Sequence, residues 1–312
     1  MAHRKGNRIR IIGMNPSRFE RGQIKFLAYL VPFAIIMMLP IVFIVSNAFK
    51  PLDELFIYPP KMITTRPTLE NFQNLTATSV NQAIPASRYL FNSLVSTLAV
   101  VILTVLITVC AAYCMSKKKY RLKKMLFELN TLSLMFVPVA VGIPRYFIVE
   151  QLGLVDSFLS GIIPALAMPI GLFLVKQFID QLPNELLEAS AIDGASDYFI
   201  VFRIVMPNIL PALSTVAMLT FQSSWNSTDA SVYYINNEAL KNFAYYLTTL
   251  TATAGNSNDL VSMLTGAGNV VSAVAGMGLA AAGTLLMFIP NVVLFIVLQS
   301  RVMNTMSHSG MK

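Results

Sequence analysis

Long apolar runs separated by shorter polar segments are the dominant pattern of the chain. A helix needs about 20 mostly apolar residues to cross the hydrocarbon core of a bilayer. Six runs keep this character for long enough, so we predict an all-α integral membrane protein built as a six-transmembrane-helix bundle. The predicted spans are Phe26–Phe49, Leu90–Met115, Met125–Phe147, Phe158–Phe178, Ile209–Trp225 and Leu279–Val302. Glycine and proline residues interrupt the fourth run, which packing against neighbouring helices tolerates.

Composition and charge support this class and orient the bundle. Hydrophobic residues make up 55% of the chain and charged residues 12%, with a mean hydropathy of +0.63. Most of the 23 Lys and Arg residues lie before the first span, after the second, around residues 176–203, or at the chain end. Because positive charge is retained on the cytoplasmic side, we expect both termini and the segment 183–207 to be cytoplasmic. The net charge of +8 then reflects this bias and attraction to anionic headgroups, and it predicts no nucleic-acid partner.

The first apolar run is predicted to stay in the mature protein. It begins after Lys25, is too long for a signal-peptide core and lacks a small-residue cleavage site. We expect a cytoplasmic N-terminal segment, residues 1–25, and one six-span domain, residues 26–312, embedded in the lipid bilayer. Two long segments should lie outside, at about Lys50–Arg88 and Asn226–Gly278. Within the second, Gly266–Gly278 is either a re-entrant scoop or the lip of the last span.

Residues that support catalysis or metal binding are scarce. Cys110 and Cys114 lie on one face of the second predicted span without further ligands, so we expect them to be small packing residues. His3 and His308 both lie in the terminal segments. The phosphate-binding pattern Gly-x-x-x-x-Gly-Lys-Ser/Thr is absent, as are two signatures of hydrolases. The sequence therefore predicts no enzyme, no catalytic residue, no metal site and no cofactor in this chain.

The polar segment of residues 183–207 lies between two apolar runs and begins with a predicted short helix. Asn184 can cap the free amides of a helix over about Glu185–Ala191. Its small residues would let a partner backbone approach closely. An apolar face for a partner groove is supplied by Leu186, Leu187 and Ile192.

A bend and a second short helix should complete the segment. Gly194 permits a backbone turn with positive φ, which is costly for residues that carry a Cβ. Ser196 can cap a helix that continues through about Arg203. Pro207 then marks the redirection of the chain into the fifth span.

This segment resembles a loop of a known family. Glu188-Ala189-Ser190 is followed after three residues by Gly194 and, after nine more, by Ile204-Val205-Met206-Pro207. The spacing resembles the EAA loop of ABC importer permeases, which forms the coupling helix that docks into a cleft on an ATPase subunit. Ser190 and Met206 depart from the family's alanine and leucine but are close in size. The resemblance implies a coupling element composed of Glu188, Ala189, Ser190, Asp193, Gly194, Ile204 and Pro207, in which the carboxylates pair with basic groups of the ATPase.

An ordinary amphipathic helix lying on lipid headgroups is the alternative for this segment. Such helices favour Lys and Arg on their polar face. Here one basic residue, Arg203, is outnumbered by the acidic residues Glu185, Glu188, Asp193 and Asp197. The composition therefore favours docking to a partner.

Further marks are similar to carbohydrate importers of the maltose-type family. Trp225-Asn226, at the end of the fifth span, resembles a Trp-Asn pair of that family. Residues 49–55 and 67–72 resemble its external loop, and residues 302–312 resemble the ending of a branch associated with larger oligosaccharides. The resemblance implies a permease subunit that imports a carbohydrate, most simply an oligosaccharide, through a prokaryotic inner membrane.

The same resemblance implies a set of partners. A second permease subunit would complete a dimer, with a heterodimer favoured over a homodimer. Two ATPase subunits would bind ATP and Mg, and an external substrate-binding protein would deliver the carbohydrate. This chain would be the pore-forming half of a pump whose motor is another polypeptide.

Polar side chains that can bond sugar hydroxyls cluster near the outer end of the fifth span, and others lie in the second and third. We expect the substrate pathway to be lined by Gln222, Ser223, Ser224, Trp225, Asn226, Asn92 and Asn130. Alternatively, such side chains bond neighbouring helices or backbone. The partner permease alone would then contact the sugar.

Two other transporter classes remain as alternatives. An ion-coupled secondary transporter generally buries ionisable residues at mid-membrane, whereas Glu128 and Arg145 lie near the two ends of the third predicted span. An ABC permease for an amino acid, phosphate or a metal ion would share the coupling loop. The residues that resemble carbohydrate importers are what favour a sugar.

Overall fold

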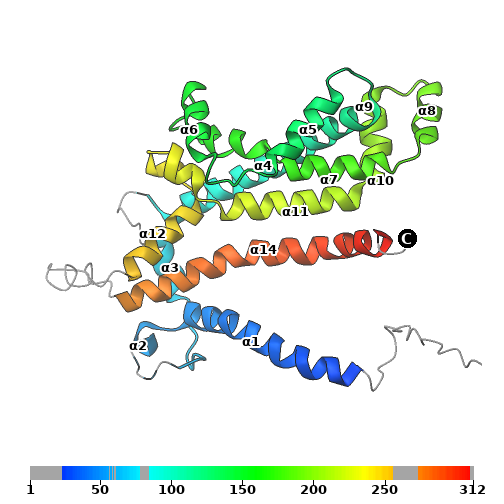
Figure 1. The fold of residues 1–312 in the computed structure, drawn as a ribbon. Helices are drawn as coiled ribbons and strands as arrows, with labels where there is room; N and C mark the ends of the chain where they lie inside the picture. The colour runs from blue at the N-terminus through cyan, green and yellow to red at the C-terminus, as the bar shows by residue number, and fades with distance from the viewer. Residues whose placement is uncertain are drawn as a thin grey trace, which may run out of the picture.

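The protein folds into a layered bundle of helices. A computed structural model describes residues 23–255 and 273–309, apart from Phe56, Tyr58, Pro60 and residues 78–83, and all regular elements in these ranges are helical. The four longest helices run roughly side by side (Figure 1): α1 (Gln23–Phe49), α4 (Ala86–Lys117), α11 (Leu210–Asn226) and α14 (Ala273–Ser309). The N-terminal segment 1–22 lies outside the described residues.

Three of the predicted spans are continuous helices. In the part of the chain that the structure describes, the helices long and apolar enough to cross a bilayer are Phe26–Phe49, Ala86–Lys117 and Met277–Gln299. Two bent helix pairs raise this number to at most five. The structure therefore supports a helical membrane protein, and the count of six spans stays a prediction.

The third predicted span is not a single helix. The chain forms α5 (Lys123–Ser133), passes through turns, and starts again as α6 (Gly142–Gln151). Pro138 lies in the middle of the break. It lacks a backbone N–H and also disfavours helical geometry at the residue before it, so a helix cannot run through it without losing hydrogen bonds. The prediction of one helix over Met125–Phe147 gave this proline too little weight.

The fourth and fifth predicted spans belong to bent pairs. Two 3-10 turns, η1 (Phe158–Gly161) and η2 (Ile163–Leu166), meet α7 (Pro169–Asp180) at 42°. The segment Asp197–Asn208 meets α11 at 85°. Both breaks are followed by a proline in the first turn of the next helix, where the missing N–H costs no intrahelical bond.

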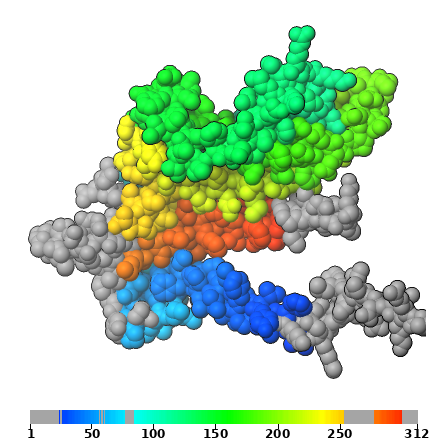
Figure 2. Space-filling view, viewed as in Figure 1, coloured from blue at the N-terminus to red at the C-terminus, as the bar shows by residue number. Residues whose placement is uncertain are grey.

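Packing divides the bundle into two sides. α4 packs against α7 and α11, while α14 packs against α1, α11 and α12 (Phe243–Gly255). In the space-filling view α1 lies beside α14, away from the green segments that include α7 (Figure 2). Cys110 and Cys114 of α4 are free and exposed, so they do not pack into the chain's own core as the sequence suggested.

The two ends of the bundle differ in construction. The N-terminal end of α1, the C-terminal end of α14 and α8 (Asn184–Ile192) lie at one end, with α3 (Glu70–Ala77) and α12 at the other (Figure 1). The predicted external loop after α1 carries α2 (Leu52–Leu55) and α3. Residues 273–278 belong to α14, and the rest of the predicted Gly-rich scoop lies outside the described residues.

Buried polar groups fix the loop after α1. The buried Lys50 ammonium donates to Asn47 Oδ1 at 2.8 Å and to the Lys61 carbonyl. Glu54, also buried, accepts hydrogen bonds from Thr65 and Thr64, which lower the pKa of its carboxyl to about 2. Buried charges are retained when they are paired or hydrogen-bonded in this way.

Trp225 joins two helices at the core of the α12 end. Its side chain is 1% exposed and stacks on Phe221 with ring centroids 5.7 Å apart. Its indole Nε1 donates to the Met287 carbonyl of α14 at 3.0 Å. Both faces of the ring and its one polar atom are thus used in packing.

We expect Trp225→Ala to destabilise the protein strongly. Removing a buried aromatic side chain costs about 3–5 kcal/mol, whereas Trp225→Phe keeps a ring and loses mainly the hydrogen bond, about 1 kcal/mol. Thermal unfolding in detergent should rank wild type above Trp225→Phe and the latter well above Trp225→Ala. Equal melting temperatures for all three would show that the ring does not hold α11 to α14.

Candidate functional site

A short helical hairpin lies at the end of the bundle that holds the C-terminal end of α14. α7 ends at Asp180, α8 runs over Asn184–Ile192, and α9 (Asp197–Phe199) follows a tight turn. Asn184 does not cap α8 as predicted, because it is already the first helical residue. Its side-chain oxygen instead accepts a hydrogen bond from Lys117 Nζ of α4 at 2.8 Å.

Gly194 closes α8 in the conformation that the sequence predicts. Its φ is +82°, and the Gly194 amide donates to the Ala191 carbonyl at 3.1 Å. The next amide, that of Ala195, donates to the Ser190 carbonyl at 3.0 Å. These two bonds form a Schellman motif, in which the residue after the cap has positive φ. Nothing lies within 4 Å of an added Cβ, so conformation rather than space requires glycine here.

The chain beyond Gly194 follows the predicted course with one shift. The Ser196 hydroxyl accepts from the Phe199 amide at 3.3 Å and so caps α9, as predicted. A π-helical turn, η3 (Ile200–Val205), and α10 (Met206–Asn208) lead to the bend. The redirection occurs at Ile209, two residues after Pro207, because Pro211 cannot donate a hydrogen bond back into α10.

The hairpin presents a mixed acidic and apolar surface. Glu188, Ala189 and Asp193 are exposed, and Ile192 is 86% exposed. The predicted apolar face of α8 is only partly available, since Leu187 is buried in a core cluster with Val109, Val175 and Val205. Large exposed side chains on the same hairpin are Leu186, Ile192, Tyr198 and Phe199. Ile204 is partly buried against the core, and Pro207 is exposed.

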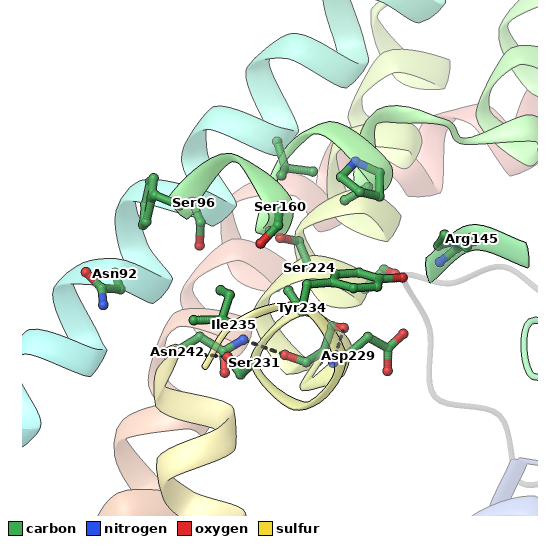
Figure 3. Close-up of a pocket in the computed structure, with 18 of the residues that line it drawn as sticks. Asn92, Ser96, Arg145, Ser160, Ser224, Asp229, Ser231, Tyr234, Ile235 and Asn242 are labelled. Carbon is green, nitrogen blue, oxygen red and sulfur yellow. Dashed lines mark hydrogen bonds between the residues drawn. The ribbon is translucent and has the colours of Figure 1, made fainter. Parts of the chain in front are cut away.

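A polar cavity of about 280 Å³ lies away from the hairpin, between α4, α11 and the irregular segments around η1, η2 and η4 (Ala230–Tyr234). Its lining is rich in hydroxyl and amide groups, several of which are drawn in Figure 3. The polar members are Asn92, Ser96, Arg145, Ser160, Thr220, Ser223, Ser224, Ser227, Asp229, Ser231, Tyr234 and Asn242.

Internal hydrogen bonds shape the wall of the cavity. The Asn242 amide donates to Ser231 Oγ at 3.0 Å, and Asn242 Nδ2 donates to the Ser227 carbonyl at 2.6 Å. Ser160 Oγ donates to the Ser157 carbonyl at 2.7 Å. The Tyr234 hydroxyl points toward Arg145 (Figure 3). These bonds hold in place the 3-10 turn of η1 and the π-helical turn of η4 beside the cavity.

The structure brings together only some of the predicted pathway residues. Asn92, Ser223 and Ser224 line the cavity. Gln222 and Asn226 are exposed elsewhere on α11, and Trp225 is buried against α14. Asn130 lies on α5, where its Nδ2 donates to the Pro169 carbonyl at 3.2 Å. Asn92 Nδ2 donates to the carbonyls of Ala239 and Lys241 at 2.8 and 2.9 Å.

The sequence reasoning missed most of the cavity wall. The segments around Ser160 and residues 227–242 were predicted as part of an interrupted span and as an external loop. A signal was available, because Gly161, Pro164 and Pro169 break the helix that would otherwise close this space. Among the described residues, no group of three His, Cys, Asp or Glu residues could hold a metal ion.

Comparison with known proteins identifies the family. The family model described as "Binding-protein-dependent transport system inner membrane component" matches residues 89–300. The chain belongs to this family. The match begins within α4 and ends within α14, so it covers both the hairpin and the cavity of the permease. Family membership decides against an ion-coupled secondary transporter and makes the chain a membrane component rather than a catalytic subunit.

Relatives and a solved structure are consistent with this assignment. The permease is 29% identical over 222 residues, 70% of its length and 72% of the relative's, to the probable ABC transporter permease protein YurM of Bacillus subtilis. It is 26% identical to the arabinooligosaccharides transport system permease protein AraQ of Halalkalibacterium halodurans, over 89% of this chain and 92% of that one. Its fold matches a chain of a bacterial ABC transporter involved in import of the acidic polysaccharide alginate, with TM-score 0.76, 19% identity and coverage of 91% and 98%.

Two apolar residues of α8 should behave differently when truncated. Leu187→Ala removes a buried contact between the hairpin and the bundle, so we expect it to cost about 2–5 kcal/mol. Ile192→Ala changes an exposed side chain and should alter stability by about 0.5 kcal/mol or less. The melting temperatures of the two variants are measured on the purified permease in detergent. If both variants lose the same stability, the buried Leu187 side chain is not what attaches α8 to the bundle.

Proposed function

We propose that this chain is a permease subunit of an ATP-driven ABC importer that carries an oligosaccharide. The observation that supports this proposal best is that the hairpin and the polar cavity lie apart on one bundle. A rigid acidic and apolar hairpin projects at one end, and a polar cavity lies away from it among broken helices. The names of relatives that transport sugar oligomers support the same substrate class.

The hairpin is proposed as the coupling element. α8 is short, its end is fixed by the Schellman motif at Gly194, and the exposed Glu188 and Ile192 face away from the buried Leu187. An anchored helix with an exposed acidic and apolar surface suits a groove on a partner that carries basic residues. Glu188, Ala189, Ser190, Asp193 and Gly194 would dock on the ATPase, and Ile204 and Pro207 would connect the hairpin to α11.

The cavity is proposed as part of the substrate pathway. Its lining combines many neutral hydroxyl and amide groups with apolar residues, and Phe158 and Tyr234 supply aromatic rings. Sugars offer many hydroxyls that both donate and accept, so such a lining matches them better than it matches a metal ion or phosphate. Ser223, Ser224 and Asn92 are proposed to take part from the predicted set, together with Ser160 and Ser231.

The assembly is proposed to contain further subunits. A second permease, with a heterodimer favoured, would complete the pathway beside the cavity. Two ATPase subunits would bind ATP and Mg at the end that holds α8, and an external binding protein would deliver substrate at the end that holds α3 and α12. The positive charges after α4 and around α8 support a cytoplasmic position for that end and for both termini.

The first test is purification of the tagged permease from its native membrane. We expect an ATPase subunit to copurify, and ATP hydrolysis to rise when a cognate oligosaccharide and its binding protein are added. Gly194→Pro should remove uptake, because proline fixes φ near −65° and cannot reach +82°. Gly194→Ala should have a smaller effect, since a left-handed alanine costs about 1–2 kcal/mol.

Three outcomes would contradict the proposal. Full uptake by the Gly194→Pro permease would remove the coupling role of the hairpin. If an amino acid or phosphate stimulates ATP hydrolysis and oligosaccharides do not, the substrate is not a sugar. A permease that purifies without any nucleotide-binding subunit would remove the importer assignment.

A second test fills the cavity. Ser223 lines it, carries an exposed side chain and lies next to Gln222, which is exposed and does not line it. We expect Ser223→Trp to lower oligosaccharide uptake by about tenfold or more, since pockets discriminate small steric changes by such factors. Gln222→Trp adds the same bulk outside the cavity and should transport normally. Equal uptake by both variants would place the substrate elsewhere.

A further inference from the structure

Two adjacent lysines at the C-terminal end of α4 hold both ends of the α8 hairpin. Lys117 is the last residue of α4 and Lys118 follows it. Most of the basic residues nearby are what the positive-inside bias alone requires. Lys119 and Arg121, for example, are exposed and form no ion pair with any described residue. The first two lysines are different because each has defined acceptors.

Lys117 binds the start of the hairpin. Its Nζ donates to the Leu182 carbonyl and to Asn184 Oδ1, both at 2.8 Å. These acceptors lie on either side of Pro183, in the turn that leads from α7 into α8. A neighbouring bond strengthens the junction, since Ser116 Oγ donates to Asp180 Oδ1 at 2.5 Å.

Lys118 binds the end of the hairpin. Its Nζ lies 2.6 Å from Asp197 Oδ1, at the first residue of α9. The Tyr113 hydroxyl donates to the same oxygen at 3.4 Å. The hydrogen bond to Asp197 raises the pKa of Lys118 above its usual value, so the ammonium stays charged. The pair is half-exposed and adds little to stability. Its main contribution is to position the hairpin relative to α4.

The other end of α4 is bound just as firmly beside the cavity. Ser93 Oγ accepts from the Phe243 amide at 2.7 Å, and Asn92 bonds two carbonyls of the segment before α12. Asn92, Ser96 and Val100 of the same helix line the cavity. A helix of 32 residues spans about 48 Å at 1.5 Å per residue. One continuous helix therefore joins the hairpin to the cavity wall.

We propose that α4 transmits movement of the hairpin to the cavity, and that Lys117 and Lys118 are the positioning residues that make the hairpin and α4 move as one body. The inference rests on the proposed function, because the movement is supplied by an ATPase docked on α8. Neither lysine touches substrate. Their effect is to convert displacement of both ends of the hairpin, at Asn184 and Asp197, into displacement of Asn92 and Ser96.

The test compares two double variants in the full transporter complex reconstituted in liposomes. Lys117→Met/Lys118→Met removes the two bonded lysines, and Lys119→Met/Arg121→Met removes the same charge from neighbouring unbonded positions. We expect the first variant to assemble with the ATPase and to hydrolyse ATP without substrate at rates within about twofold of wild type. Its substrate-stimulated hydrolysis and uptake should fall by about tenfold, the loss expected for charged hydrogen bonds. The second should match wild type in every measurement.

A charge exchange gives a separate readout for the contact itself. Lys118→Asp should reduce the ratio of uptake to ATP hydrolysis, and adding Asp197→Lys should restore it. A purely structural role would change the amount of assembled complex without changing this ratio. Failure of the exchange to restore the ratio would contradict the Lys118–Asp197 contact as the link.

The outcomes separate this inference from the proposed function. Normal stimulation and uptake in Lys117→Met/Lys118→Met would overturn the role of α4 and leave the importer assignment standing. Loss of ATPase binding in that variant would also overturn it, since the lysines would then serve docking. No sugar-dependent uptake by the unmodified complex would overturn the proposed function and, with it, the coupling role of the lysines.

Discussion

The need to satisfy every backbone N–H and C=O without water is the constraint on which this structure depends. In lipid an unpaired peptide group costs several kcal/mol, so an exposed apolar segment must be a helix. α1 shows the simplest consequence, since it remains helical although most of its side chains are exposed and apolar. At η1 and η4, where the helices are irregular, Ser160 and Ser231 are buried and line the cavity. The same rule that makes the bundle therefore also restricts where a polar cavity can form.

Both functional features occur where proline or glycine ends a helix and side chains replace the lost backbone bonds. At the hairpin, the Schellman motif at Gly194 and the Ser196 cap satisfy the groups left by α8 and α9. At the cavity, the side chains of Ser231, Ser160 and Asn242 bond the broken segments. The two proposed sites thus lie at the interruptions, and the long helices separate them. α4 is the helix that touches both.

Local signals in the sequence were sufficient to predict part of this structure. The helices α1, α4 and α14, the positive φ of Gly194 and the cap by Ser196 follow from runs of apolar residues and from single residue types. The break at Pro138 was also a local signal, but the apolar run around it outweighed it in the prediction. Long-range contacts were beyond such reasoning. The side chain of Asn184 accepts a hydrogen bond from Lys117, 67 residues away, and Leu187 is buried by helices that no pattern within residues 183–207 reveals.

The chemistry of the cavity also bears on how tightly it can hold a sugar. Several of its hydroxyl and amide groups already bond the protein, and a ligand competes with those bonds and with water for the rest, so each new hydrogen bond contributes only about 0.5–1.5 kcal/mol. Passage requires binding that is favourable enough to admit the solute and weak enough to release it. A lining whose polar groups are mostly neutral, with Arg145 and Asp229 as its charged members, meets both conditions better than a site built from several charged groups. Under the proposed function and the proposed role of α4, selection among sugars falls to the external binding protein, and the permease contributes a path that opens when α4 moves.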